Sequence, residues 1–203
     1  REMFHVKHGE KQMQKNETYS VEITGLTAEG EGVARVDGQV VFVPGVIPGE
    51  RCKIKIDHVG RTCAYGSLVR VEKTSEHRVT PECESFGKCG GCVFWHMDYA
   101  CELEQKRRRV QDALSRIGGI DFPDLQITGS ESIYGYRNKV QFPVQVQNGK
   151  AVAGFYKAGS HTVIPITDCK IQPEVAKTIR AAVLSWMEKE NVPAYDERTH
   201  TGL

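Results

Sequence analysis

The sequence predicts a small all-β barrel followed by an α+β domain that carries a cysteine-rich loop. Short apolar segments separated by glycine turns fill residues 17–72, three cysteines crowd into loop 83–97, and strand-like segments lie between two helix-like segments in the remainder of 83–203. Residues 1–16 are polar and basic without periodicity, so we expect a flexible lead-in. Residues 73–82 are polar and are expected to be a linker.

The composition is that of an ordinary globular protein. Hydrophobic residues make up 39% and charged residues 26% of the 203 residues, and the formal net charge is +1. A nucleic-acid partner would therefore need a local basic surface, because the bulk charge supplies none. No stretch reaches the ~20 apolar residues of a membrane span and no export leader is recognisable, so we expect a cytoplasmic protein without a membrane partner.

The first domain is predicted from alternation and turn signals. Apolar residues alternate or cluster in segments 19–23, 33–36, 40–43, 52–56 and 64–71. Asp37-Gly38 is a strong hairpin signal between two of these segments. Five short strands without a helix pattern favour a small closed barrel of the oligonucleotide-binding type.

The second domain opens with a predicted helix. Asp98 is placed to cap a helix over residues 99–117, and Gly118-Gly119 supplies its stop signal. Four apolar residues fall on one face of it at helical spacing: Leu103, Val110, Leu114 and Ile117.

A hairpin and a second helix follow. Residues 137–147 and 151–157 alternate around Asn148-Gly149, and 163–166 predicts another strand. Pro173 opens a helix to about Asn191. Its buried face is expected to hold Val175, Ile179, Ala182, Val183 and Trp186. The domain is α+β, and we expect its end to lie beyond Leu203.

Seven cysteines without an export signal point to ligation rather than to disulfides. Cys83, Cys89 and Cys92 lie on one loop, and Cys169, in a turn after a strand, is the candidate fourth ligand. Three-plus-one cysteine ligation is usual for a cubane iron–sulfur cluster. His96 keeps a Cys3His zinc site open, and incidental free thiols are the third reading.

The surroundings of this loop suit a cluster. Gly90 and Gly91 allow backbone N–H groups to approach the sulfurs. Phe86, Phe94 and Trp95 would supply an apolar shell. The other cysteines are expected to be structural: Cys52 and Cys63 read as core residues, and Cys101 is held on the first helix.

Basic and aromatic residues suggest RNA. The helix carries Lys106, Arg107, Arg108 and Arg109, a run that is often only a solvated face. In the barrel, a cationic groove could be lined by Arg35, Lys53, Lys55, Arg61 and Arg70. In the second domain, the candidates for contact with unstacked bases are Tyr134, Tyr136, Arg137 and Lys139. Together these groups favour RNA over a purely solvated surface.

With these residues in view, the chain resembles the N-terminal part of the iron–sulfur RNA (uracil-5-)-methyltransferase family. Residues 30–34, 41–45 and 48–50 resemble the TRAM domain, an RNA-binding barrel. Loop 83–92 resembles the cluster loop of that family.

The later motifs resemble the central domain of the same family. They are residues 136–143, 154–156 and the turn at Cys169, and the resemblance extends from about residue 17 to Leu203. It implies that Cys83, Cys89, Cys92 and Cys169 hold a [4Fe-4S] cluster. It also implies methyl transfer from S-adenosylmethionine to C5 of a uridine.

The sequence lacks the motifs that would perform this transfer. It contains no glycine-rich strand–helix turn for the cofactor and no nucleophile loop, which the resemblance assigns to a methyltransferase domain after Leu203. We therefore expect these 203 residues to bind RNA, as a monomer, without methylating it. Possession of both barrel and cluster loop resembles the branch that acts on 23S ribosomal RNA. The alternatives are a non-enzymatic, zinc-stabilised RNA-binding module and an electron-transfer protein.

Overall fold

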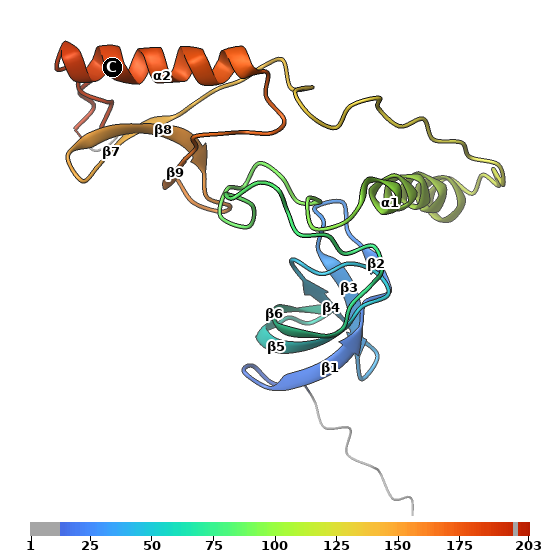
Figure 1. Ribbon diagram of the computed structural model, residues 1–203. Coiled ribbons are helices and arrows are strands. Elements are labelled where there is room, and N and C mark those ends of the chain that lie inside the picture. Colours follow the sequence, from blue (N-terminus) through green and yellow to red (C-terminus); the bar gives the residue numbers. More distant parts are fainter. Residues whose placement is uncertain (1–12, 197–198) are drawn as a thin grey trace, which may run out of the picture. The chain divides into compact units, whose positions relative to one another are not determined.

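The computed structural model describes residues 13–196 and 199–203, which form two compact units (Figure 1). The first unit extends to Val79 and resumes over His96–Leu125, and the second comprises Thr80–Trp95 and Gln126–Leu203. The first predicted helix therefore groups with the barrel and not with the α+β domain. Most of the expected lead-in lies outside the described residues, although Met13 is buried in the barrel core.

The first unit contains a six-stranded sheet in the order β1-β5-β6-β4-β3-β2. Its strands are β1 (Thr18–Glu22), β2 (Gly25–Leu26), β3 (Gly32–Val36), β4 (Gln39–Val43), β5 (Arg51–Val59) and β6 (Cys63–Lys73). The expected closed barrel is wrong, because the described residues form no ladder between the outer strands β1 and β2. The two-residue β2 is too short to continue the ladder.

Alternation along the strands separates core from surface as predicted. In β5, Cys52, Ile54 and Ile56 are fully buried, whereas Lys53 and Lys55 point to the other face. Gly32 faces the same core, where a Cβ atom would lie 2.2 Å from a methyl group of Val46. Burial of each such aliphatic side chain contributes about 1.5–3 kcal/mol.

Helix α1 (Tyr99–Asp112) begins where Asp98 caps it. The Asp98 carboxylate accepts the backbone N–H of Cys101 at 2.7 Å. The helix continues as a π-helical turn, η1 (Ala113–Ile117), which ends at Gly118. Helical periodicity therefore predicted the extent of the helix but not its change of pitch.

The second unit contains a three-stranded antiparallel sheet and one helix. The sheet has the order β7-β8-β9, formed by β7 (Val144–Gln147), β8 (Lys150–Tyr156) and β9 (Val163–Pro165), and α2 (Glu174–Lys189) packs against β8. The Asn148-Gly149 hairpin is confirmed, with both residues at positive φ. Gly154 allows β9 to approach closely, because a Cβ atom there would collide with the Ile164 carbonyl group.

The expected burial of the apolar face of α2 is wrong. Val175, Ile179 and Trp186 are 59%, 57% and 50% exposed, and Met187 is the buried residue of this helix. Helical spacing predicts a shared face but not what covers it. In the described residues, no helix combines the length and hydropathy that a membrane crossing requires.

Candidate metal centre and nucleic-acid interface

The cysteine loop is a series of backbone turns attached to the second sheet. The N–H groups of Phe86 and Cys89 donate to the carbonyls of Cys83 and Ser85, at 3.0 and 2.9 Å. The N–H of Gly90 donates to the carbonyl of Tyr156 at the end of β8, at 3.0 Å.

Glycine fits closely at this attachment point. A Cβ atom on Gly90 would lie 3.1 Å from the backbone nitrogen of Ala158 and 3.2 Å from the carbonyl oxygen of Tyr156. The backbone at Cys89 and Gly90 thus attaches the loop to the end of β8.

Cys169 lies in a turn that backbone hydrogen bonds join to the predicted RNA-contact segment. The N–H of Gln172 donates to the Cys169 carbonyl at 3.2 Å. The N–H groups of Gly135 and Arg137 donate to the carbonyls of Lys170 and Ile171, at 2.9 and 2.8 Å. The same segment that carries Tyr136 and Lys139 therefore passes beside the Cys169 turn.

The four predicted ligand thiols belong to one unit and interact electrostatically. Burial, and after it the charges of Cys169, Cys89 and Cys83, together raise the pKa of the Cys92 thiol to about 11, while Arg137 opposes the shift. Burial, together with the charges of Cys83 and Cys89, also raises the pKa of Cys169. Four thiolates held this way repel one another unless a cationic centre lies among them.

The donor set fits a soft metal centre in its chemistry. All seven cysteines are free thiols. The N–H of Gly91 donates to the Cys89 sulfur at 3.3 Å, and N–H groups of Ile171 and Gln172 bond to Cys169, which suits thiolate ligands. In the described part of the chain, however, no three or more His, Cys, Asp or Glu side chains are spaced to hold a metal ion. The ligand set thus stays a prediction.

His96 and the three remaining cysteines lie in the barrel unit. His96 is buried there, with Nε2 3.3 Å from the carbonyl oxygen of Val46, and burial lowers its pKa. Cys101 is buried on α1, and Cys52 is fully buried in β5. Cys63 is half-buried at the start of β6. The unit that holds the cysteine loop contributes only Cys169 as a further thiol.

The apolar shell expected around the thiols stays a prediction. Phe86, Phe94 and Trp95 are each half-buried. The Trp95 ring lies 5.8 Å from that of Tyr134, whose hydroxyl donates to Glu82 at 2.8 Å. Tyr134, a proposed base-stacking residue, is therefore engaged with the cysteine loop.

The predicted basic residues of the barrel lie on its outer face and at one end. Lys53 pairs across the ladder with Arg70, and Arg70 is in turn bound to Glu72 at 2.8 Å. Arg35 and Arg61 are exposed on two different hairpins. The Gln39 side chain joins these hairpins by donating to the Gly60 carbonyl at 2.9 Å.

Three aromatic residues that the sequence analysis missed lie on the same outer face. Tyr65 is 44% exposed, and its ring lies 5.6 Å from Phe42 and 6.5 Å from His58. The signal was available, since Phe42 alternates with the core residues Val41 and Val43 and must face outward. Exposed rings beside cations are typical of surfaces that stack nucleic-acid bases.

The basic run of α1 is largely neutralised within its own helix. Lys106 pairs with Glu102 at 2.6 Å, whereas Arg107 and Arg108 both pair with Glu104, at 2.8 and 2.6 Å. Hydrogen bonds from Arg107 and Arg108 lower the pKa of Glu104 to about 2. Arg109 has no ion pair among the described residues. The structure thus favours the interpretation that three of these four cations belong to an ordinary solvated helix face and do not bind RNA.

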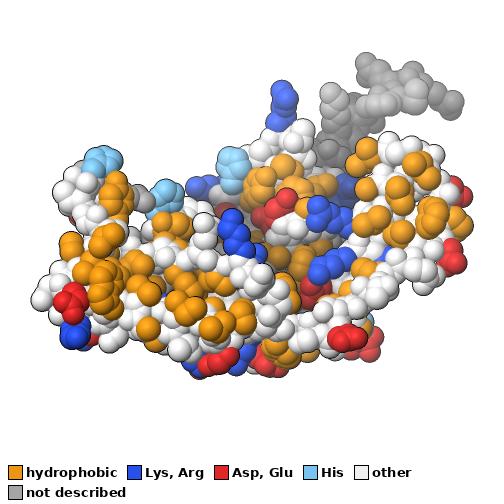
Figure 2. Space-filling model, turned by 90° about the horizontal axis from the view of Figure 1, so that it is seen from above, with side chains coloured by type: hydrophobic (Ala, Val, Ile, Leu, Met, Phe, Trp, Pro, Cys, Tyr) orange, Lys and Arg blue, Asp and Glu red, His pale blue; other side chains and the backbone are white. Residues whose placement is uncertain are grey.

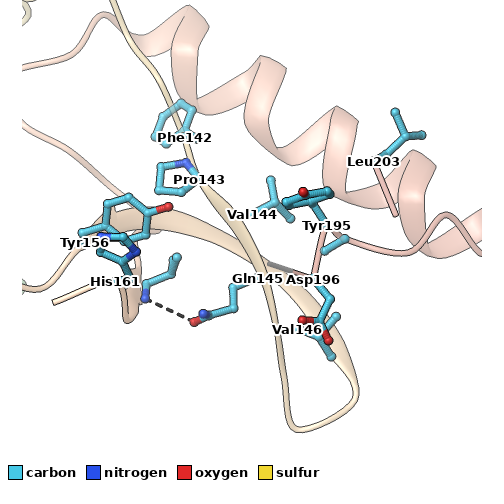
Figure 3. Close-up of a pocket in the computed structure, with 12 residues that line it drawn as sticks. Phe142, Pro143, Val144, Gln145, Val146, Tyr156, His161, Tyr195, Asp196 and Leu203 are labelled. Atoms are coloured by element: carbon cyan, nitrogen blue, oxygen red, sulfur yellow. Dashed lines mark hydrogen bonds between the residues drawn. The ribbon is translucent and has the colours of Figure 1, made fainter. Parts of the chain in front are cut away.

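The second unit contains a hollow that no sequence motif predicted. It has a volume of about 650 Å³ and lies between the β7–β8 hairpin and the last residues of the chain (Figure 3). Tyr156 stacks on His161 at 5.4 Å, and Gln145 accepts the N–H of Val163 at 3.2 Å.

The remaining residues of this unit that were predicted to contact RNA are exposed. They are Tyr136, Arg137 and Lys139.

Comparison with known families identifies the barrel. Residues 12–69 match the family described as the TRAM domain. The first unit is built on a TRAM domain. This confirms the domain that residues 30–34, 41–45 and 48–50 predicted, with the open sheet described above.

Comparison over the whole chain extends beyond the TRAM domain. An uncharacterised RNA methyltransferase of Clostridium tetani is 42% identical over 190 residues, which is 94% of this chain and 41% of that protein. Another, of Oceanobacillus iheyensis, is 39% identical over 93% of this chain and 41% of its own length. The chain thus spans about two fifths of the relatives that it matches.

A solved structure shares the fold. The tRNA (uracil-54, C5)-methyltransferase of Pyrococcus abyssi, in complex with S-adenosyl-L-homocysteine, matches with a TM-score of 0.62 at 19% identity. The match covers 90% of this chain and 40% of that one. At this identity the likeness is one of fold.

Proposed function

We propose that this chain is the RNA-recognition part of an S-adenosylmethionine-dependent RNA (uracil-5-)-methyltransferase acting on 23S ribosomal RNA. Relatives of 35–42% identity that are named as RNA methyltransferases support the class of enzyme. The TRAM domain and the outer face of the barrel support RNA as the partner. Ribosomal RNA as the target, the cytoplasm as its location and a monomeric state belong to the proposal.

The observation that carries the proposal furthest is the grouping of four thiols in one unit. Cys83, Cys89, Cys92 and Cys169 are proposed to ligate a [4Fe-4S] cluster. Bound there, the cluster would supply a cationic centre that links the loop to the turn. The turn is hydrogen-bonded to the segment of Tyr136 and Lys139, so a centre at the thiols would stiffen a stretch proposed to contact RNA.

Within these residues, the proposed work is binding and orientation. The exposed rings of Tyr65 and His58 would stack on unpaired bases, and Arg35 and Arg61 would contact phosphates beside them. S-adenosylmethionine and the reacting uridine are assigned to the part of the protein outside these 203 residues. The chain therefore contributes substrate selection to the reaction.

Metal and sulfide analysis tests the centre. Protein purified without oxygen is expected to contain about four iron atoms and about four labile sulfides per chain. Cys169→Ser should lose most of the iron, whereas Cys63→Ser, a thiol of the barrel unit, should retain it. One zinc without sulfide would replace this proposal with the zinc-stabilised binding module.

Methylation assays test the reaction and the target separately. The longer protein, incubated with methyl-labelled S-adenosylmethionine, is expected to label uridine in 23S ribosomal RNA isolated from cells that lack the gene. Label in transfer RNA alone would move the target to that class of RNA. Absence of label from both RNAs would overturn the enzymatic proposal. Binding of RNA by the barrel would then be tested separately by its affinity for single-stranded RNA.

A further inference from the structure

Helix α2 has one apolar face that is wider than the part covered by the sheet. Its inner side contains Met187, which is 5% exposed, with the half-buried Ala176 and Leu184. Arg180 closes the margin of this side by donating to the Thr167 carbonyl at 2.9 Å. This side packs against β8, as the amphipathic pattern of an ordinary surface helix requires.

The apolar face of α2 continues beyond the buried side as an exposed stripe. Val175, Ile179, Val183 and Trp186 recur at intervals of four, four and three residues, and they are 59%, 57%, 44% and 50% exposed. We call these four residues the outer stripe. Hydrophobic side chains gather on the left of Figure 2, over the unit that carries α2. The core-facing stripe of a surface helix is normally covered, so the exposed half of this apolar face lacks the contact that its pattern predicts.

We propose that the outer stripe is the docking surface for a segment of the same polypeptide that lies outside these 203 residues. The matched relatives are more than twice as long as the span they share with this chain. More than half of each relative therefore lies outside the part that corresponds to these 203 residues. Leu203 is hydrogen-bonded to Pro193 and Tyr195, just beyond the end of α2. A chain that continues from Leu203 would therefore start close to the C-terminal end of α2.

The chemistry of the stripe favours this occupant over RNA. All four side chains are hydrocarbon or indole, and none carries a cation that could contact a phosphate group. RNA-binding surfaces depend on such cations, because counterion release supplies most of their affinity. The stripe therefore calls for an apolar protein surface.

The size of the stripe favours an intramolecular contact over a second copy. From Val175 to Trp186 the stripe is roughly 17 Å long and ~10 Å wide. That is well below the ~800 Å² per partner that a standard interface between separate molecules buries. A segment tethered to the same chain avoids most of the translational and rotational cost of association, so a smaller contact is sufficient.

A pair of substitutions, made in two lengths of the protein, tests the proposal. In the longer polypeptide, Ile179→Glu with Val183→Glu is expected to lower the Tm by roughly 5 °C or more. In the 203-residue chain the same pair should change the Tm by no more than about 1 °C, because both positions are exposed there. As a matched control, Thr178→Glu with Ser185→Glu changes two exposed positions of α2 outside the stripe and should be tolerated in both lengths.

The solvent accessibility of Trp186, measured by side-chain labelling, is a second test that needs no substitution. Hydroxyl-radical oxidation of Trp186, measured by mass spectrometry, is expected to be several-fold slower in the longer polypeptide than in the 203-residue chain. Equal rates in the two lengths would overturn the proposal. Protection of the 203-residue chain that grows with its concentration would assign the stripe to a second copy, and protection only on addition of RNA would assign it to RNA. The proposal stands or falls independently of the methylation assays, since neither measurement involves the reaction.

Discussion

Arg78 forms a two-pronged ion pair with Glu50, a residue 28 positions earlier in the sequence. Arg78 Nη2 lies 2.8 Å from Glu50 Oε2, and its Nε donates to Oε1. The carboxylate is fully buried and also accepts the Ile47 N–H at 3.1 Å, while Arg78 donates to the Gly45 carbonyl at 2.9 Å. The pair therefore fixes the segment after β6 onto the loop between β4 and β5.

Removal of the buried carboxylate should destabilise the TRAM domain strongly. Glu50→Ala leaves the Arg78 guanidinium and the Ile47 N–H without their partner, and breaking a buried pair in this way costs about 3–5 kcal/mol. Hydrogen exchange of the β5 amides, followed by mass spectrometry, should show a matching loss of protection. Glu29→Ala, an exposed acidic residue of the same unit, should leave that protection unchanged.

The same carboxylate should make the barrel sensitive to acid. Burial alone would raise the pKa of Glu50, but hydrogen bonds from Arg78 and the Ile47 N–H outweigh it and hold the pKa below the ordinary 4.5. Because the folded pKa lies below the unfolded one, the stabilisation is fully present above the unfolded value and is lost as pH falls through the folded value. Urea unfolding of Glu50→Gln should therefore show a smaller loss of stability below pH 4.5 than the natural protein does. Parallel pH profiles for the two would count against this assignment.

Asp98 should stabilise the start of α1 by its cap. Asp98→Ala removes the acceptor for the Cys101 N–H and should cost about 1 kcal/mol, seen as faster hydrogen exchange in the first turn. Asp98→Asn keeps a capping oxygen and should cost only a few tenths of that. The Asp98 contact with His77, at 2.8 Å, is a partly exposed pair and adds little. If both variants exchange equally fast, the cap is not the stabilising element.

The outer face of the barrel should contribute more RNA affinity than the basic run of α1. Tyr65→Ala is expected to cost about 1–3 kcal/mol of binding, the value of one stacked base. Replacing both Arg35 and Arg61 with alanine should reduce the slope of log affinity against log salt by about two, at roughly one per phosphate contact. Fluorescence anisotropy with single-stranded RNA measures both effects.

Two control variants complete the RNA measurement. Val69→Ala changes an exposed apolar residue of β6 that has no ring, and should leave the affinity unaltered. Arg107→Ala with Arg108→Ala should weaken binding less than Tyr65→Ala does, since both arginines are already bound to Glu104. A larger loss from the helix variant would return the interface to α1.

Much of the local structure could be predicted because local rules determine it. Alternation assigned Cys52, Ile54 and Ile56 to the core of the barrel, the Asp98 cap predicted the start of α1, and Asn148-Gly149 predicted a hairpin. Each of these depends on backbone geometry over a few residues. The extent of pairing at the sheet edges depends on strand length and could not be obtained in this way, which is why the closed barrel was wrong.

The sequence by itself determined five of the six strands of the first sheet, the start of α1 and the Asn148-Gly149 hairpin, and it predicted the four ligand thiols. The tertiary structure alone decided that α1 and the buried His96 group with the barrel unit, and that Arg78 forms an ion pair with Glu50. These relationships join residues that are far apart along the chain, so no periodicity or spacing encodes them. They arise because buried polar groups must find partners wherever folding brings one within reach.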